Sequence, residues 1–210
     1  MRRVAVVLVA LAVSGCARQL YSTSAPASKP SSTPVTLAGA TNVARPIVTP
    51  VSSVEAVDYL LASGLLLPVA GVATAQLRDT FDEGRDGGRV HRALDIMSPR
   101  GTPILSADDG RVLRIGFNEL GGNSIYASDS LGRVVYYYAH LDAYRPGLVQ
   151  GALIARGDTL GFVGTTGNAP KDTPHLHFQV MRMPPDGKYW DGDPINPFPI
   201  LLLTHEHVRP

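Results

Sequence analysis

The sequence predicts a mainly β fold, a compact twisted antiparallel β-sheet domain with one short N-terminal helix. Three observations favour this fold. The chain contains 21 Gly and 17 Pro among 210 residues, which suits short strands joined by turns better than a helical bundle. After residue 65, apolar runs of strand length alternate with turn-type clusters. Only the segment just before that point has the apolar spacing of a helix.

Residues 1–15 have the pattern of a signal peptide. Arg2 and Arg3 precede the apolar run 4–13, which is too short to span a bilayer, since a spanning helix needs about 20 residues. The next residues, Val13-Ser14-Gly15-Cys16, resemble the lipobox of bacterial lipoproteins. That resemblance implies cleavage before Cys16 and lipid attachment at Cys16. Ala17 after it resembles an outer-membrane lipoprotein facing the periplasm, and an ordinary signal peptide is the alternative.

Residues 16–51 are rich in Ser, Thr, Pro and Ala and are expected to form a lipid-anchored flexible linker, because they bury too little apolar surface to fold. A flexible chain of this length spans about 30–35 Å. Residues 52–64 then predict a short helix that begins at the capping box of Ser52 and Glu55 and ends at Gly64. We expect the helix to pack at the domain entrance, and a lid is the less favoured alternative.

Residues 65–200 are expected to form one β domain with no second folded domain. Its candidate strands are separated by turn clusters such as Asp108-Asp109-Gly110 and Gly121-Gly122. The strands are expected at 103–107, 111–115, 124–128, 133–139, 159–163 and 175–181. Residues 184–199 are expected to form a loop. Residues 201–210, with His205-Glu206-His207, are expected to be a solvated tail.

Net charge and cysteine content argue against nucleic-acid binding and against disulfide or thiolate-rich zinc sites. The net charge of +1 gives no electrostatic case for nucleic-acid binding. Cys16 is the only cysteine, so an intramolecular disulfide is excluded and a structural zinc site rich in thiolates is not expected.

His175-Leu176-His177 lies in a predicted strand. Side chains alternate along a strand, so both imidazoles point to one face and Leu176 and Phe178 to the other. Two adjacent imidazoles tolerate each other when one is neutral and bound to a metal. The alternative is a surface strand with two satisfied histidines.

His91 and Asp95 form a second polar pair. In an extended strand their Cα atoms would lie about 13 Å apart, so the chain must bend if both are to meet one ion. A partly buried carboxylate needs a cation or strong hydrogen bonds. A metal would satisfy it, and a salt bridge to Arg92 or Arg100 is the alternative. Three protein ligands with one open position are typical of catalytic zinc, although nitrogen and oxygen donors also allow Mn²⁺.

The chain resembles the lysostaphin/LytM-type zinc endopeptidases over residues 66–200. The family pattern of His-x-x-x-Asp, a later His after a Tyr-containing strand and His-x-His is present here in order. It is formed by His91 with Asp95, Tyr138-Ala139-His140-Leu141, and His175 with His177. Gly101-Thr102-Pro103-Ile104, Asp109-Gly110-Arg111-Val112 and 161–167 also resemble family stretches. The family commonly has Gly two residues after the first His, where this chain has Ala93.

The resemblance implies a LytM/duplicated-hybrid-motif fold and one Zn²⁺ bound by His91, Asp95 and His177. His140 and His175 would be the catalytic, non-ligand pair. The implied activity is hydrolysis of peptidoglycan stem-peptide crosslinks in cell-wall remodelling, most simply a D-Ala to diaminopimelate bond rather than a Gly-Gly bridge.

Two other functions remain open from the sequence. A non-catalytic LytM-type activator of cell-wall amidases would typically lack zinc ligands, and all of them are present. A lipoyl-like carrier would need an exposed Lys at a hairpin tip, and no Lys lies between Gly71 and Asn168. Tyr189 and Trp190 could line a substrate groove or cap the core.

Overall fold

The computed structural model describes residues 51–206. The signal peptide expected at 1–15, the lipidation site at Cys16 and all of the linker except Val51 lie outside this range. Residues 207–210 lie outside it as well. Within the described residues, no helix is long and apolar enough to cross a membrane.

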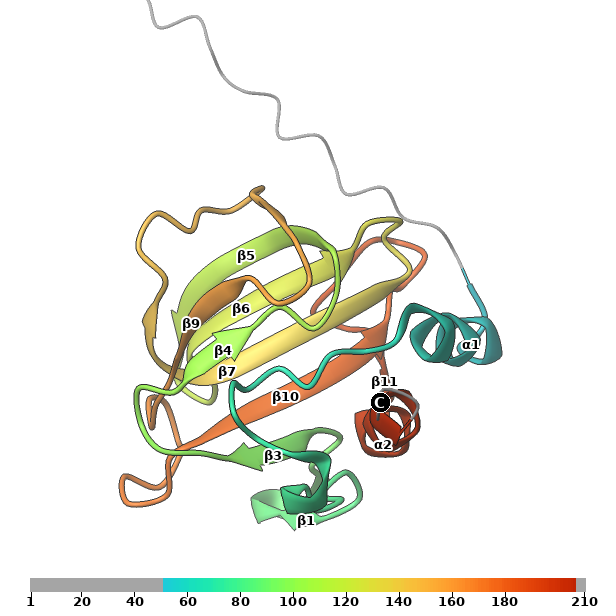
Figure 1. Ribbon diagram of the computed structural model, residues 1–210. Coiled ribbons are helices and arrows are strands. Elements are labelled where there is room, and N and C mark those ends of the chain that lie inside the picture. Colours follow the sequence, from blue (N-terminus) through green and yellow to red (C-terminus); the bar gives the residue numbers. More distant parts are fainter. Residues whose placement is uncertain (1–50, 207–210) are drawn as a thin grey trace, which may run out of the picture. The chain divides into compact units, whose positions relative to one another are not determined.

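A large antiparallel sheet dominates the described part of the chain (Figure 1). Its central path runs β11-β10-β7-β6-β5-β8, with β3 beside β10 and the β4–β9 pair joined to β7. The strands are β3 (Leu94–Met97), β4 (Pro103–Leu105), β5 (Gly110–Asn118), β6 (Gly122–Asp129), β7 (Val134–Tyr144), β8 (Leu153–Ile154), β9 (Thr159–Val163), β10 (His175–Arg182) and β11 (Asp193–Ile195). The predicted mainly β, antiparallel fold is therefore confirmed.

The remaining elements lie around this sheet. A two-stranded hairpin, β1 (Gly84–Arg85) and β2 (Arg89–Val90), precedes β3 and encloses the short turn η2 (Asp86–Gly88). The short turn η1 (Thr74–Gln76) precedes the hairpin. The helices α1 (Ser53–Ser63) and α2 (Pro197–Glu206) lie close to each other at one edge of the sheet (Figure 1).

Strand β7 is buried on both faces, and its alternating residues define two packing layers. Tyr136 and Tyr138 belong to the main apolar core. Tyr137 and Ala139 belong to a smaller cluster, so they point to the opposite face. Residues of β10 divide in the same way, with Phe178 in the main core and Met181 in the smaller cluster.

The N-terminal helix α1 has the capping box expected from the sequence. The Ser52 hydroxyl accepts from the Glu55 amide, and the Glu55 carboxylate accepts from the Ser52 amide. Gly64 ends the helix with a φ of 72°, a conformation that glycine adopts without strain. The buried Leu60 belongs to the main core, so α1 packs against the domain as one of its fixed elements.

The C-terminal part of the domain contains more regular structure than we expected. The expected loop 184–199 includes β11 and the start of α2, and α2 continues through residues 201–206 of the expected tail. Leu201 is fully buried, and Nε2 of His205 accepts a hydrogen bond from the Leu67 amide at 3.1 Å. His205 therefore has a packing role at the helix end.

Candidate metal centre

His91 and Asp95 are brought together by a bend between β2 and β3. Arg92 has a φ of 58°, which turns the chain sharply where an extended strand would separate the two side chains. The bend is held by the Arg92 amide, which donates to the Phe81 carbonyl at 2.7 Å. As a result, Nε2 of His91 lies 3.0 Å from Oδ1 of Asp95. The family's Gly position, here Ala93, is buried and does not have a positive φ.

His177 reaches the same point from β10. The antiparallel register places His177 opposite Asp95 of β3 on one side and opposite Ala139 of β7 on the other. Its Nδ1 lies 3.0 Å from Nε2 of His91 and 3.2 Å from Oδ1 of Asp95. Leu176 and Phe178 point into the main core and are fully buried, as the alternation predicted.

The three donor atoms fit a divalent metal ion. Nδ1 of His91 lies 2.9 Å from the Thr80 carbonyl oxygen, which only accepts, so Nδ1 carries the proton and neutral His91 presents a lone pair at Nε2. Nε2 of His91 and Oδ1 of Asp95 therefore face each other as acceptors. A proton on His177 cannot lie in line with both at once, whereas an ion about 2 Å from each atom contacts all three.

The spacing agrees with that geometry. Donor atoms around a tetrahedral zinc ion with bonds of about 2.0–2.1 Å lie roughly 3.3 Å apart. The three observed separations of 3.0, 3.0 and 3.2 Å are close to this value. Within the described residues, His91, Asp95 and His177 are the group of side chains that could hold a metal ion.

Thr80 holds both partners of the His91–Asp95 pair, and sequence reasoning missed it. Its carbonyl orients the His91 ring. Its hydroxyl accepts from the Asp95 amide at 3.0 Å and donates to the Ala93 carbonyl at 3.2 Å. Thr80 is buried, so this single polar residue stabilises the bend from inside the domain.

His140 lies beside these three residues in a strained backbone conformation. Its φ is 63°, a region that costs a non-glycine residue about 1–2 kcal/mol. The Gly164 backbone passes so close that an added Cβ would lie 2.8 Å from the His140 carbonyl oxygen. The conformation places the His140 ring centroid 5.0 Å from that of His175 and 5.6 Å from that of His177.

His140 and His175 are oriented in the same way as His91. Nδ1 of His140 donates to the Thr166 carbonyl at 2.9 Å, and Nδ1 of His175 donates to the Thr173 carbonyl at 2.8 Å. Both rings therefore present a lone pair at Nε2 when neutral. Nε2 of His175 lies 3.8 Å from Oδ1 of Asp95, so it is next to the group of three donor atoms but not part of it.

Burial lowers the pKa values of two imidazoles in the cluster and so favours their neutral forms, which have a lone pair for a cation. Burial lowers the pKa of His140 to about 4, so the ring is neutral at pH 7. Burial also lowers the pKa of His177, against the opposing effect of Asp95.

Arg85 on β1 is the salt-bridge partner of Asp95, where the sequence suggested Arg92 or Arg100. Nη2 of Arg85 lies 2.5 Å from Oδ2 of Asp95. Arg92 instead pairs with Asp82, and Arg100 pairs with Asp142. The sequence held no spacing signal for Arg85, because the β1–β2 hairpin that brings it inward is formed by two strands of two residues each.

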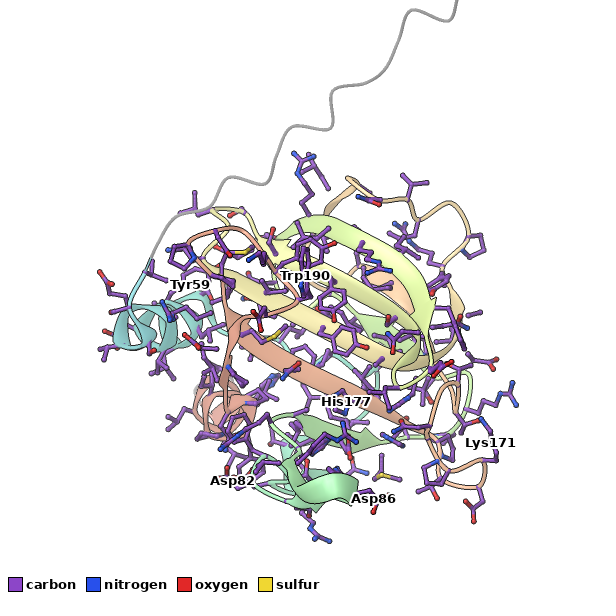
Figure 2. The ribbon with its side chains drawn as sticks, turned by 180° about the vertical axis from the view of Figure 1, so that it is seen from behind. Tyr59, Asp82, Asp86, Lys171, His177 and Trp190 are labelled. Atoms are coloured by element: carbon purple, nitrogen blue, oxygen red, sulfur yellow. The ribbon has the colours of Figure 1, made fainter. Side chains whose placement is uncertain are left out.

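An aromatic row extends from the cluster across the same face of the sheet. Tyr137 lies 6.1 Å from His177 between ring centroids, and Tyr126 lies 4.4 Å from Tyr137. Tyr189 packs on Tyr126 at 5.3 Å. Trp190, whose position relative to His177 can be followed in Figure 2, is 57% exposed. Tyr189 thus covers part of the smaller cluster, while Trp190 faces solvent.

Known proteins with similar sequences are named as endopeptidases. L-Ala--D-Glu endopeptidase of Bacillus subtilis (strain 168) is 32% identical over 125 residues, which cover 56% of this chain and 37% of the relative. Peptidoglycan DD-endopeptidase ShyC of Vibrio cholerae is 34% identical over 93 residues, which cover 44% of this chain and 20% of the relative. The chain thus spans 37% or less of the length of these two curated relatives.

A solved structure supports the fold, and a family model supports the assignment. A putative glycyl-glycine endopeptidase LytM of Ruminococcus gnavus matches with a TM-score of 0.57 and 26% identity, covering 70% of this chain and 62% of that one. The resemblance to the lysostaphin/LytM proteins is therefore confirmed. The model of peptidase family M23 matches residues 89–197, more than half of the chain, and the chain belongs to peptidase family M23.

Proposed function

We propose that this chain is a zinc-dependent endopeptidase that hydrolyses peptide crosslinks of peptidoglycan. The observation that carries the proposal is the convergence of three electron-rich atoms, from His91, Asp95 and His177, within 3.0 to 3.2 Å of one another. Membership of peptidase family M23 supports it, as do the endopeptidase names of two relatives, one of them a peptidoglycan DD-endopeptidase.

The proposed chemistry divides the site into ligands and proton-transfer groups. A zinc ion held by His91 Nε2, His177 Nδ1 and Asp95 Oδ1 would polarise the scissile carbonyl and lower the pKa of bound water to about 7. His175 accepts the proton of the attacking water at Nε2, because that lone pair lies beside the ligand atoms.

His140 has the complementary role in this proposal. The proton that His175 takes from the water is the proton that the leaving amine must receive. The neutral His140 ring has a free Nε2, which takes up this proton and passes it to the amine nitrogen as the C–N bond breaks, and in its protonated form it hydrogen-bonds the developing oxyanion. The strained backbone of His140 supports a functional role, since such conformations concentrate at active sites.

We further propose a location and a bond for this activity. The lipobox around Cys16 supports lipid anchoring in the outer membrane facing the periplasm, with residues 16–51 as the tether to the wall. The D-Ala to diaminopimelate crosslink is the proposed substrate bond, supported by the name of the Vibrio relative. Incorporation of radiolabelled palmitate that disappears in Cys16→Ala tests the anchor.

Digestion of purified peptidoglycan tests the activity. The full chain is incubated with sacculi alone, with a chelator, and with the chelator followed by excess Zn²⁺, and the released muropeptides are identified by mass spectrometry. We expect crosslinked dimers to become monomers, chelator to stop this, and zinc to restore it. Intact dimers in all three reactions would contradict the enzyme and favour the non-catalytic amidase activator, which amidase stimulation by the same sample would then reveal.

A further inference from the structure

The two oxygens of Asp95 have different partners. Oδ1 faces Nε2 of His91 and Nδ1 of His177, so it is the oxygen available to a metal. Oδ2 points away from them and accepts from Nη2 of Arg85 at 2.5 Å. Within residues 51–206, no second side chain donates to Oδ2.

Arg85 is held in place by the hairpin that precedes β3. It lies opposite Arg89 in the β1–β2 register. Glu83 is next to this hairpin, and its carbonyl accepts from the His91 amide at 2.9 Å. Oε2 of Glu83 also lies 3.9 Å from the Arg85 guanidinium. The guanidinium therefore approaches Asp95 from a segment that is hydrogen-bonded to a proposed ligand.

We propose that Arg85 is a positioning residue that holds Oδ2 of Asp95 and restricts this carboxylate to one-oxygen coordination of the metal. The inference rests on the metal site in the proposed function. A carboxylate that coordinates through both oxygens would occupy the position that a catalytic site keeps open for water or substrate. Partners that hold a ligand from outside typically change metal affinity by 10- to 100-fold when removed.

An ordinary surface ion pair would behave differently. Exposed pairs contribute little to stability, and the Arg85 side chain is 36% exposed. The Asp95 side chain, however, is only 16% exposed, and its other oxygen belongs to the three converging donors. If Arg85 were only a surface charge, its loss would leave both the affinity and the geometry of the bound metal unchanged.

Arg85→Gln in the full chain, purified in detergent, tests the inference against a matched control. The control is Arg89→Gln, because Arg89 carries the same charge in the same hairpin, is exposed, and donates from Nε to the Asp86 carbonyl. Zinc affinity is measured by competition with a chromogenic chelator. The coordination geometry is measured by the visible absorption of the Co²⁺-substituted protein.

We expect Arg85→Gln to weaken zinc binding by about tenfold or more and to change the Co²⁺ spectrum toward higher coordination number. Arg89→Gln should match the wild type in both measurements. Arg85→Lys keeps the charge but lacks the planar fork, so it should restore part of the affinity. Thermal melting of the metal-free proteins separates misfolding from a site effect, and Arg85→Lys alone carries the comparison if Arg85→Gln does not fold.

Two outcomes would overturn the inference. One is identical affinity and Co²⁺ spectrum in Arg85→Gln and Arg89→Gln. The other is tighter zinc binding in Arg85→Gln, which would mean that the guanidinium only opposes the charge of the ion. Failure of the wild type to bind zinc would instead remove the proposed function, so the two failures are distinguishable.

Discussion

Asp108 and Asp95 are two largely buried carboxylates of the same domain that differ in the number of hydrogen-bond donors around them. Asp108 is surrounded by donors: the hydroxyls of Tyr59 and Tyr136 point at Oδ2, and the Arg156 guanidinium points at Oδ1. Asp95 has one such donor, Arg85, while its other oxygen faces a lone pair of His91. Both carboxylate oxygens of Asp108 thus have donors within the fold, whereas the proposed Asp95 site would be completed by a cation.

The two sites also differ in what they connect. Asp108 joins α1 to the face of β7 that carries the main core, because Tyr59 lies on α1 and Tyr136 on β7. In Figure 2, Tyr59 lies with α1 at an edge of the sheet, away from His177. Asp95 joins β3 to β10 on the smaller-cluster face. The difference suggests that substitutions at Asp108 affect folding, and substitutions at Asp95 affect metal and chemistry.

The largest effect is expected from Asp95→Asn. Asn lacks the negative charge that a divalent ion needs, so we expect zinc loss and a fall in cleavage of roughly 10³-fold or more. Elemental analysis and muropeptide release measure the two quantities. His177→Ala should lose the metal as well. Zinc retained at wild-type stoichiometry in His177→Ala would rule out the proposed ligand set.

His175→Ala and His140→Ala sharpen the division between ligands and proton-transfer groups. Each should lower the turnover of peptidoglycan cleavage by about 10²- to 10⁴-fold while zinc stays bound. His205→Ala is the control, because His205 contacts the Leu67 amide outside the cluster and should leave turnover unchanged. Loss of zinc in both site variants would show that the division is wrong.

Asp108→Asn should act on folding. Removing the charge weakens the contact with Arg156 in a buried setting, and breaking such a pair costs about 3 kcal/mol. Urea denaturation measures the free energy of unfolding, and elemental analysis of the folded protein should still find the wild-type zinc content. An unchanged unfolding free energy together with lost zinc would reverse the comparison.

Tyr59→Phe should have the smallest effect, about 1 kcal/mol of unfolding free energy, since it removes one hydrogen bond. Burial and Asp108 raise the pKa of Tyr59. Its stabilising contribution is therefore fully present below about pH 10 and decreases at higher pH, where the unfolded chain ionises first. Denaturation at pH 8 and above pH 10 should show the difference from wild type shrinking, and a difference that grows would contradict this account.

Much of the sheet was predictable because its strands alternate in local sequence. The buried Leu176 and Phe178 and the inward His175 and His177 followed from period two alone. Helix α2 was missed because Pro197 and Pro199 suggested a loop. Pro is compatible with the first turn of a helix, and the Asn196 side chain accepts from the Phe198 amide at 2.9 Å, a capping signal that was present in the sequence.

The site was predictable only in part. The pairs His175–His177 and His91–Asp95 were singled out from local sequence, whereas the division of the five polar residues into ligands and catalytic groups came from the family resemblance. The requirement for a bend came from the distance between His91 and Asp95. The position of the bend at Arg92 did not follow, because the αL conformation there depends on the Phe81 carbonyl. Thr80 and Arg85 could not be found either, since both act across folded segments whose pairing has no short-range pattern.

Three of the four site histidines are oriented by main-chain oxygens, those of residues 80, 166 and 173. Every amino acid supplies such an oxygen, so saturation mutagenesis at position 173 would recover many functional replacements and hide its role. Insertions, deletions or proline scanning would expose it, because they move the backbone itself. The ring orientations are in this sense encoded by the path of the chain, and they can persist while the residues along that path diverge.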